Sequence, residues 1–431
     1  MKKICILGMG YIGLPTAAMF ATHNVQVVGV DINQSIIQTL SSGGIHIQEN
    51  GLQELVSQAL QSGNLRPALT PEPADAFVIA VPTPFNADKT ADMRAVAAAT
   101  ESIVPHLRKG NLVILESTSP PLTTVNLVKP ILEKSGMQAG IDFLLAYSPE
   151  RVLPGQILRE LVENARVIGG VNPDSAQAGR ALYAAFVKGE IVMTDATTAE
   201  LVKLMENTYR DVNIAIANEF SRLADRFGAD IWEVVEIANR HPRVKILSPG
   251  PGVGGHCISV DPWFLVEAAP DLTPLILTAR KVNDAQPAYV VELVQRAMGG
   301  KLAGHSIAVL GLSYKPNVDD LRESPAVEIA HLLAQAGAQV KAYEPFKPQE
   351  RFQGFETVAT LEEALQNAEL IALLVGHQQF RSLQPQQAAQ LTTARLIVDA
   401  VNGWPADQWS AAGFIFQQIG VGSTKSRSQQ Q

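Results

Sequence analysis

The sequence predicts an α/β protein with two Rossmann-like, doubly wound parallel-sheet domains joined by a central helical domain that contains one long helix. Short apolar runs alternate with helix-like stretches over residues 1–192 and again over residues 300–418, a pattern typical of βαβ units. Between them, residues 197–227 contain no Pro or Gly and are rich in Ala, Leu, Glu and Arg, which predicts a single extended helix. We therefore expect a central domain at residues 193–299 and, after the last domain, a disordered polar tail at residues 419–431.

The candidate strands of the first domain are mostly continuous apolar runs without period-two alternation, which indicates strands buried on both faces of a sheet. We expect strands at Lys3–Leu7, Gln26–Val30, Phe77–Val81, Leu112–Glu116, Leu144–Tyr147, Val167–Ile168 and Ile191–Met193. Crossover helices are expected at Leu52–Ser62 and Met93–Leu107.

The remaining two domains differ from each other in pattern. In the central domain, helices after the long one are expected at Asp230–Asn239, from Asp261 and Pro262 onward, and at Thr273–Met298 with a bend near Pro287. The last domain returns to the βαβ pattern, with strands expected at Ser306–Leu310, Gln339–Tyr343, Leu370–Val375, Leu396–Val398 and near Phe414–Phe416. Its helices are expected at Pro325–Gln335 and Leu361–Gln366.

The uncharged stretch that follows Lys2 and Lys3 is the one segment that resembles a signal peptide or a membrane anchor. Three glycines and Pro15 interrupt it, so we interpret it as a strand, a turn and a helix. No other segment approaches membrane-spanning length. We therefore expect a soluble, cytoplasmic protein with no membrane partner.

The composition excludes several classes of protein. The 431 residues include 34 Lys and Arg against 42 Asp and Glu, a net charge of −8, which provides no electrostatic footprint for nucleic acid. Only two cysteines, Cys5 and Cys257, are present, so a disulfide framework is excluded and a reducing cytosol is the expected setting. Two lone cysteines and eight scattered histidines build no zinc site, and we expect no metal.

A glycine-rich string, Gly8-Met9-Gly10-Tyr11-Ile12-Gly13, directly follows the first strand and opens a helix. In this context the glycines permit a tight turn and let the backbone approach a pyrophosphate at the helix N-terminus. Asp31 ends the second strand 18 residues after Gly13, where a carboxylate accepts from a ribose 2′-hydroxyl and favours NAD over NADP. The alternative is a glycine-rich turn that packs helix on sheet, with Asp31 as a turn residue.

Two threonines in the first domain follow strand ends that point toward the same ligand edge. Thr83 and Thr118 come after the strands at residues 77–81 and 112–116, where a doubly wound sheet presents its ligand contacts. Each threonine alone suits a cap or turn, but beside the glycine string we expect both to contact the cofactor.

The start of the long helix carries Lys203, Asn207 and Arg210 at spacings i, i+4 and i+7, which places them on one stripe. A helical lysine is usually a solvated charge. Here an amide and a guanidinium share its stripe, so the three together suit a polar, anionic ligand.

The two cysteines have different settings. Cys5 lies inside the first strand and is expected to be a small buried hydrophobe. Cys257 follows a glycine-rich loop and precedes a helix start, whose dipole favours a thiolate, and Asp261 supplies a carboxylate four residues on. We expect Cys257 to be a nucleophile rather than a structural residue.

In the last domain the first strand is followed by Gly311 but by no second G-x-G-x-x-G string. The segment from Tyr314 to Ser324 instead offers Lys315 and Arg322, which suggests phosphate contact rather than a second dinucleotide site. The alternative is an ion-paired loop.

These motifs together resemble the UDP-glucose/GDP-mannose dehydrogenase family, in order and over nearly the whole chain. The resemblance rests on Gly8 to Gly13, the Tyr-Ser-Pro-Glu-Arg-Val-Leu-Pro-Gly segment at 147–155, Lys203 with Asn207, the Gly-Gly-His-Cys loop ending at Cys257, and Lys315 through Ser324. Within the family, residues 239–247 and 249–264 are most similar to enzymes that act on UDP-N-acetyl-D-mannosamine.

The resemblance implies a four-electron oxidation of a sugar C6 alcohol to a carboxylate by two NAD in succession. It implies that Lys203 and Asp261 polarise the alcohol or a water, and that Cys257 forms a thiohemiacetal and then a thioester. Asn207 and Lys203 would stabilise the oxyanion, and Glu150 would assist hydrolysis.

The resemblance also implies binding roles and an assembly. Residues that match nucleotide-sugar contacts of the family are Arg151, Val152, Lys203, Asn207, Arg210, His241, Arg243 and Gly254, with Tyr314 and Lys315 at the UDP part. Arg322 would reach the cofactor, and a homodimer through the long helix, with Arg243 crossing the interface, would be the assembly.

Other functions remain open at this point. UDP-N-acetylglucosamine, UDP-glucose and GDP-mannose are alternative substrates. A two-electron β-hydroxyacid or 6-phosphogluconate-type dehydrogenase shares the first domain and a Lys-x-x-x-Asn pair, but needs neither Cys257 nor a second α/β domain. An NAD-binding protein without catalysis would not require Lys203, Asn207 and Asp261.

Overall fold

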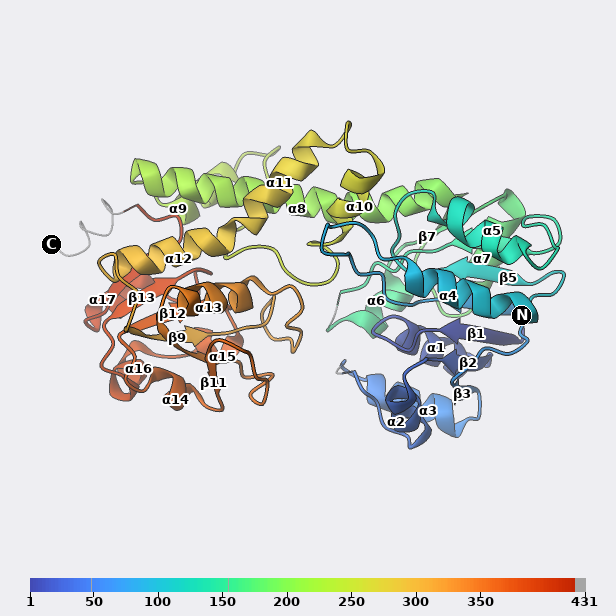
Figure 1. Ribbon diagram of the computed structural model, residues 1–431, viewed down its shortest axis with the longest axis horizontal. Helices are drawn as coiled ribbons and strands as arrows, with labels where there is room; N and C mark the ends of the chain where they lie inside the picture. The colour runs from blue at the N-terminus through green and yellow to red at the C-terminus, as the bar shows by residue number, and fades with distance from the viewer. Residues whose placement is uncertain (48, 154, 423–431) are drawn as a thin grey trace. The chain divides into compact units, whose positions relative to one another are not determined.

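The computed structural model describes residues 1–422 except residues 48 and 154. The chain divides into two compact units, one of Met1–Glu206 with Trp263–Leu272 and one of Asn207–Pro262 with Thr273–Gln431. Each unit contains one α/β domain (Figure 1), and the predicted fold class is confirmed. The division falls within the long helix, so the predicted central domain is shared between the two units.

The first unit contains an eight-stranded sheet in the order β3-β2-β1-β4-β5-β6-β7-β8. Its strands are β1 (Lys3–Leu7), β2 (Gln26–Val30), β3 (Leu65–Ala68), β4 (Ala76–Ile79), β5 (Leu112–Leu115), β6 (Leu144–Tyr147), β7 (Arg166–Gly170) and β8 (Ile191–Asp195). The sheet is parallel as predicted except at one pair, where β6 and β7 are antiparallel. Strand direction depends on the path of the connection, which no local pattern reveals.

Helices cover both faces of this sheet. They are α1 (Gly13–Thr22), α2 (Gln34–Ser41), α3 (Leu52–Gln61), α4 (Arg94–Ile103), α5 (Lys129–Glu133), α6 (Ile157–Glu163) and α7 (Pro173–Tyr183), with a 3₁₀ turn at Val104–His106 and a π-helical turn at Thr124–Val128. Successive strand residues face opposite sides, so Ile4 and Ile6 pack with α1 and α3 while Cys5 and Leu7 pack with α4.

The second unit contains a wholly parallel six-stranded sheet in the order β11-β10-β9-β12-β13-β14. Its strands are β9 (Ser306–Leu310), β10 (Gln339–Tyr343), β11 (Glu356–Val358), β12 (Leu370–Leu373), β13 (Leu396–Asp399) and β14 (Ile415–Gln418). The two sheets thus share one order for their first five strands: the second and third strands in the chain lie on one side of the first strand, and the fourth and fifth lie on the other. The strands that sequence patterns missed, β3 and β11, are both short edge strands with polar residues.

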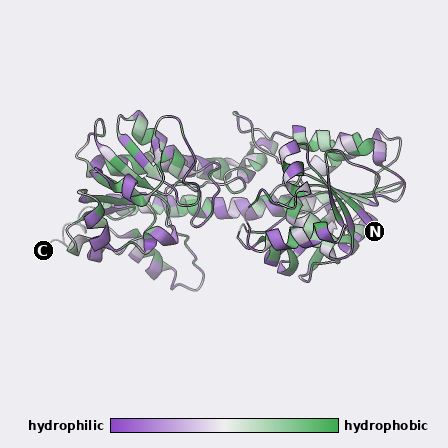
Figure 2. Ribbon diagram, turned by 90° about the horizontal axis from the view of Figure 1, so that it is seen from below, coloured by the Kyte–Doolittle hydropathy of each residue, from purple (hydrophilic) through white to green (hydrophobic). Residues whose placement is uncertain are grey.

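Two groups of helices enclose the second sheet. In Figure 1, α12 (Gln286–Ala297) and α13 (Pro325–Gln335) lie above it, while α14 (Leu361–Leu365) and α16 (Pro385–Leu391) lie below. The short helices α15 (Gln378–Arg381) and α17 (Ala406–Ala411) complete the domain. Figure 2 shows hydrophobic residues gathered along the strands of both sheets, as their burial on both faces requires.

The long helix α8 (Ala196–Phe227) begins within one residue of its predicted start and ends at its predicted end. It is followed by α9 (Ile231–Ala238), α10 (Asp261–Ala268) and α11 (Pro274–Asp284). The single bent helix expected at Thr273–Met298 is two helices that meet at Ala285, because Pro287 has no N–H to continue the helical hydrogen bonds. Among the described residues, no helix is long and apolar enough to cross a membrane.

The end of the chain differs from the expectation of a tail from residue 419. Ile419 is buried, and Val421 forms an antiparallel bridge with Asp230, so the folded chain continues past the expected boundary at residue 418. The remainder of the predicted tail, residues 423–431, lies outside the described residues.

Candidate active site

The glycine string forms a tight turn between β1 and α1. Gly8 has φ +96°, and its N–H donates to the carbonyl oxygen of Val30 at 2.7 Å. A Cβ atom at Gly13 would lie 1.8 Å from the Gly8 carbonyl oxygen, so this position admits only glycine. At Gly10 a Cβ atom would meet nothing within 4 Å. The turn therefore has no space for a side chain at Gly13, where it packs against its own backbone, but leaves free space at Gly10. Such space is what the close approach of a pyrophosphate requires.

Asp31 lies beside this turn, directly after β2. Its Oδ2 accepts the Met9 N–H at 2.9 Å and its Oδ1 accepts the Asn33 N–H at 2.8 Å, while the side chain remains half-buried. These bonds orient the carboxylate, and its partial exposure leaves it available to a ribose hydroxyl. The residues of this turn therefore fit the adenosine and pyrophosphate parts of NAD.

The other expected cofactor contacts of the first unit lie at the same edge of the sheet. Tyr11 and Ile12 are half-buried in the turn itself. Thr83 follows β4 and Thr118 follows β5, and both are half-buried. Because β1, β4 and β5 are adjacent and parallel, their carboxyl ends meet at one edge.

Glu150, expected to assist hydrolysis, lies in a buried ionic cluster. Its Oε1 accepts the Arg151 N–H at 2.6 Å, and its Oε2 pairs with the Arg166 guanidinium. Arg166 also pairs with Glu116 at 3.1 Å, and Tyr183 donates to Glu116 at 2.9 Å. Burial raises the pKa of Glu116 to about 7, despite the opposing charge of Arg166. Glu150 thus shares one cation with a second buried carboxyl.

Sequence reasoning missed this cluster. Glu116 directly follows β5, while Arg166 and Tyr183 belong to β7 and α7, and only the strand order brings them together. The one available signal was Glu116 itself, a charged residue at the end of an apolar strand close to Thr118.

Arg151 and Val152, expected to contact the nucleotide sugar, have partners within the first unit. Arg151 makes two hydrogen bonds to the Glu206 carboxylate, at 2.9 and 2.5 Å, and donates to the Ala165 carbonyl oxygen at 3.0 Å. Val152 packs against the apolar core.

The stripe on α8 is less uniform than its spacing suggested. Lys203 is buried, Asn207 is half-buried and Arg210 is exposed. Lys203 and Asn207 lie one helical turn apart and share a face, whereas the exposure of Arg210 sets it apart from that pair.

Asn207 connects α8 to the start of α10 in the second unit. Its Nδ2 donates to Oδ2 of Asp261 at 2.6 Å, and Asp261 is buried. The Asp261 N–H donates to the carbonyl oxygen of Cys257 at 2.8 Å, so Cys257 forms the turn that leads into α10. The backbone of Cys257 is therefore tied to Asp261, the partner of Asn207, just before the N-terminus of α10.

The two cysteines differ in burial. Cys257 is a half-buried free thiol, whereas Cys5 is fully buried. Burial raises the pKa of the Cys5 thiol to about 11, which disfavours a thiolate.

His256, the residue before Cys257, is one that sequence reasoning did not single out. Its Nδ1 lies 3.6 Å from Oδ2 of Asp320, an ion-pair distance. Burial lowers the pKa of His256, but Asp320 and Cys257 raise it more, to about 9. The imidazole is thus a cation near pH 7. The signal was its place beside Cys257, but its partner lies in a motif more than 60 residues away.

The Cys257 loop packs against the segment at residues 314–324. A Cβ atom at Gly254 would lie 2.4 Å from the Glu323 carbonyl oxygen, and one at Gly255 would lie 2.8 Å from the Tyr314 ring. The Gly255 N–H donates to the Arg322 carbonyl oxygen at 3.1 Å. Two motifs predicted separately therefore form one structure.

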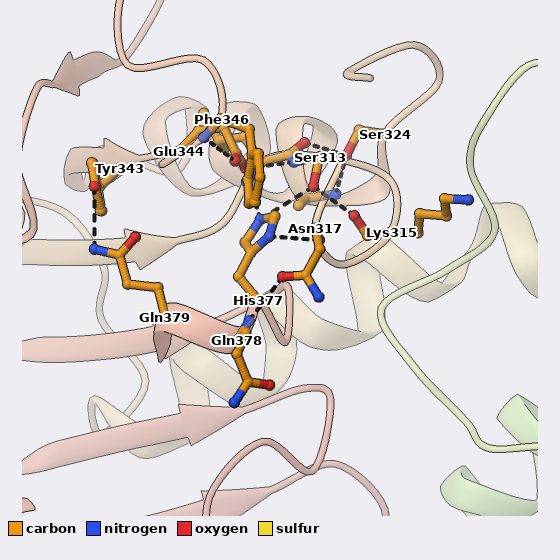
Figure 3. Close-up of polar contacts among 12 residues, drawn as sticks. Ser313, Lys315, Asn317, Ser324, Tyr343, Glu344, Phe346, His377, Gln378 and Gln379 are labelled. Atoms are coloured by element: carbon orange, nitrogen blue, oxygen red, sulfur yellow. Dashed lines mark hydrogen bonds and ion pairs between the residues drawn. The ribbon is translucent and has the colours of Figure 1, made fainter. Parts of the chain in front are cut away.

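Within this segment, the Arg322 guanidinium pairs with both oxygens of Asp320, at 2.9 and 2.6 Å. Lys315 is half-buried, and its carbonyl oxygen accepts from the Ser313 hydroxyl at 2.8 Å (Figure 3). The ion-paired loop considered from the sequence is thus present at Arg322, while Lys315 extends away from the cluster that Figure 3 shows.

His241 and Arg243 are exposed between α9 and α10. Arg243 lines a surface hollow of about 480 Å³ together with Tyr209 and Ile216 of α8 and with Lys245. Among residues 1–422 without 48 and 154, no group of three or more His, Cys, Asp or Glu side chains lies close enough to hold a metal ion.

Comparison with known proteins identifies the chain's relatives. It is 48% identical over 420 residues to an NDP-N-acetyl-D-galactosaminuronic acid dehydrogenase of Ralstonia nicotianae, covering 95% of this chain and 98% of that protein. It is 47% identical over 420 residues to the UDP-N-acetyl-D-mannosamine dehydrogenase of Escherichia coli strain K12, covering 93% and 99%. A solved UDP-D-ManNAc dehydrogenase structure from Pyrococcus horikoshii matches with a TM-score of 0.91 at 40% identity, over 97% of this chain and 99% of that one.

The family assignment follows from three consecutive matches. Residues 2–187 match the NAD binding domain, residues 197–285 the central domain and residues 308–406 the UDP binding domain of one family. The resemblance drawn from the sequence is confirmed, and the chain belongs to the UDP-glucose/GDP-mannose dehydrogenase family.

Proposed function

We propose that this protein oxidises the C6 alcohol of a UDP-N-acetylhexosamine to the uronate with NAD, and that UDP-N-acetyl-D-mannosamine is its substrate. The observation that carries the proposal is the half-buried Cys257, whose backbone carbonyl accepts from Asp261, the partner of Asn207, in a chain whose relatives are nucleotide-sugar dehydrogenases. NAD, when bound at the Gly8–Gly13 turn, supplies the hydride acceptor.

The proposed chemistry passes through the thiol. The C6 alcohol loses a proton and a hydride to give an aldehyde, and Sγ of Cys257 adds to the carbonyl carbon as a thiohemiacetal. Loss of a second hydride to a second NAD gives a thioester. Water then attacks the carbonyl carbon, the C–S bond breaks, and the carboxylate leaves with the thiol restored. One sugar therefore yields two NADH and consumes one water.

The side chains support these steps in distinct ways. Lys203 and Asp261 hold and polarise the alcohol or a water, and Lys203 with the amide of Asn207 stabilises the oxyanion. Glu150, which pairs with Arg166, directs the hydrolytic water. Tyr314 and Lys315 hold the UDP part, and Arg151, Arg210, His241, Arg243 and Gly254 face the rest of the nucleotide sugar.

The choice of sugar rests on relatives of two kinds. UDP-N-acetyl-D-mannosamine dehydrogenases share up to 47% identity with this chain, while the Ralstonia protein, named for an N-acetyl-D-galactosaminuronic acid, shares 48%. The two sugars differ in configuration at C2 and C4, so a nucleoside-diphosphate N-acetylgalactosamine is the second candidate substrate.

An absorbance assay of NADH tests the function. We expect two NADH per UDP-N-acetyl-D-mannosamine, and less turnover with UDP-N-acetylgalactosamine, UDP-N-acetylglucosamine, UDP-glucose and GDP-mannose. One NADH per sugar, with an aldehyde product, would support the two-electron alternative instead.

Cys257→Ser tests the covalent route, with Cys5→Ser as the matched control for loss of a thiol. We expect Cys257→Ser to release no uronate and Cys5→Ser to retain two NADH per sugar, because Cys5 is buried in the first strand. Full turnover to the uronate by Cys257→Ser would exclude the thioester.

We also propose a cytoplasmic homodimer formed through α8. Tyr209, Ile216, Phe220, Leu223 and Phe227 follow one another at helical spacing on α8 and are all exposed, which makes an apolar stripe suited to a second copy. Sedimentation should give twice the mass of one 46.3 kDa chain, and Phe220→Glu with Leu223→Glu should give the monomer. Free thiols and the supply of NAD and UDP-sugars for polysaccharide synthesis favour the cytoplasm.

A further inference from the structure

A buried polar cluster lies beneath the loop that carries Tyr314 and Lys315 (Figure 3). Glu344, directly after β10, accepts the N–H groups of Leu312 and Ser313 at 2.8 and 2.9 Å through one carboxylate oxygen, Oε2. The same oxygen lies 3.1 Å from Nε2 of His377. Glu344, Ser313 and His377 are all buried.

The hydrogen bonds give the two ring nitrogens of His377 different roles. Its Nδ1 lies 2.9 Å from the backbone N of Asn317, and a backbone amide can only donate. Nδ1 therefore accepts this hydrogen bond, and Nε2 is the nitrogen that donates. That N–H points to Oε2 of Glu344 and to Oγ of Ser313, which lies 3.2 Å away. The Ser313 hydroxyl gives its own proton to the Lys315 carbonyl oxygen.

Glu344 stays ionised in this setting. Burial raises the pKa of its carboxyl, but the hydrogen bonds from His377, Leu312 and Phe346 lower it more, so the net pKa lies below its ordinary value. The imidazole of His377 thus bridges a buried carboxylate on one side and a loop amide on the other.

These contacts hold the loop on both sides of Lys315. The Ser313 hydroxyl fixes the carbonyl oxygen of Lys315. Asn317, two residues later, is held by His377 and by the Gln378 N–H, which donates to Oδ1 of Asn317 at 2.9 Å. Asn317 has φ +61°, a left-handed conformation that needs such support. With its backbone turned inward, Lys315 directs its side chain away from the cluster (Figure 3).

We propose that His377 is a positioning residue which, through Glu344, Ser313 and Asn317, fixes the loop that presents Tyr314 and Lys315 to the diphosphate of the UDP-sugar. The inference rests on the proposed function, because it assumes that this loop grips UDP. The inference concerns binding of the nucleotide before the reaction. It therefore predicts a change in the affinity for the UDP-sugar and no change in the affinity for NAD.

Titration of the full chain with UDP tests the inference, with His377→Ala as the main variant. We expect the Kd for UDP and the KM for the UDP-sugar to rise about tenfold or more, while kcat at saturating sugar and the Kd for NAD change less than about threefold. Gln379→Ala, an exposed neighbour in α15 that does not touch the loop, is the matched control and should leave both constants unchanged.

Two milder variants keep the inference open to refutation if His377→Ala does not fold. His377→Asn retains an acceptor for the Asn317 amide and should recover part of the UDP affinity, and Ser313→Ala removes only the bond to Lys315 and should weaken UDP severalfold. Folded variants with unchanged UDP affinity would overturn the inference, as would equal losses for UDP and NAD. If the unaltered chain bound no UDP, the proposed function itself would fail, and this inference with it.

Discussion

The two α/β domains begin in the same way and then diverge. Gly8 after β1 and Gly311 after β9 have φ +96° and +91°, and each donates its N–H to the last residue of the neighbouring strand, Val30 or Tyr343. In each domain the next residue after that neighbouring strand is acidic. The same backbone arrangement therefore places a carboxylate beside the glycine turn in both domains.

The surroundings of that carboxylate differ between the two domains. Asp31 takes one amide from its glycine turn, that of Met9, and stays half-buried. Glu344 takes two amides from its turn and is covered by His377. An equivalent acidic residue is thus the expected ribose contact in the first domain and an internal support in the second.

The difference also changes how each domain meets phosphate. In the first domain Gly10 leaves open space at the start of α1. In the second, the amides of Leu312 and Ser313 are occupied by the protein's own carboxylate. These two amides are therefore not available to a diphosphate, which agrees with the proposal that the Lys315 and Tyr314 side chains are the contacts.

Glycine substitutions should give the largest effects on this comparison. Gly13→Ala places a Cβ atom on the Gly8 carbonyl oxygen, so we expect the NAD affinity to fall more than about 100-fold, together with a lower melting temperature. Gly10→Ala should keep the melting temperature but weaken NAD about tenfold, since its Cβ enters only the ligand's space.

Gly311→Ala is the control in the second domain. Its Cβ would lie 2.4 Å from Cβ of Val375, so the melting temperature should fall while the NAD affinity stays unchanged. A loss of NAD binding in Gly311→Ala would show that the two domains do not separate their ligands in this way.

Glu344→Gln should give the next largest effect. It replaces an acceptor of four hydrogen bonds by a group with only one acceptor oxygen, so the free energy of unfolding should drop by about 2 kcal/mol. Urea unfolding measures this drop. The Kd for NAD, measured in parallel, should be unchanged, and a variant as stable as the original chain would contradict the supporting role.

Asp31→Ala should have a smaller effect, confined to the cofactor. We expect the NAD affinity to fall by about tenfold and the preference for NAD over NADP to shrink, because the repulsion of a 2′-phosphate disappears. Fluorescence titration with both dinucleotides checks this. An unchanged preference would argue that Asp31 does not face the ribose.

The smallest predicted effect concerns pH and compares two buried carboxyls at the ends of the corresponding strands β5 and β13. Glu116 follows β5 and Asp399 ends β13, and burial raises their pKa values to about 7 and about 6. A carboxyl with a raised folded-state pKa binds protons more tightly when folded, so its contribution to stability is lost as pH rises from its ordinary value through the raised one. For Glu116 that range is about 4.5 to 7, and for Asp399 about 3.8 to 6.

Glu116→Gln and Asp399→Asn should each gain stability relative to the original chain between pH 5 and pH 8. Urea unfolding at both pH values gives the difference between each variant and the original chain, which removes the effect of other titrating groups. A difference that stays constant or reverses with pH would contradict the raised pKa values.

Sequence patterns predicted most of the fold but only part of the site. The turn at Gly8, Asp31 and the extent of α8 follow from local spacing. Arg166 beside Glu150, and His377 beside Glu344, do not, because each pair joins segments in or after different strands that only the sheet order brings close. The contact between His256 and Asp320 also depends on tertiary structure, because two loops distant in sequence pack against each other there.

The packing of Tyr314 on Gly254 and Gly255 has a regiochemical consequence. Under the proposed function, the grip on the diphosphate and the reactive sulfur at residue 257 belong to one rigid piece of chain. The distance between the diphosphate site and the sulfur is then fixed. Only the sugar carbon that lies at this distance from the phosphorus atoms is oxidised. Hexoses and pentoses attached to the same nucleotide would then be told apart by length alone.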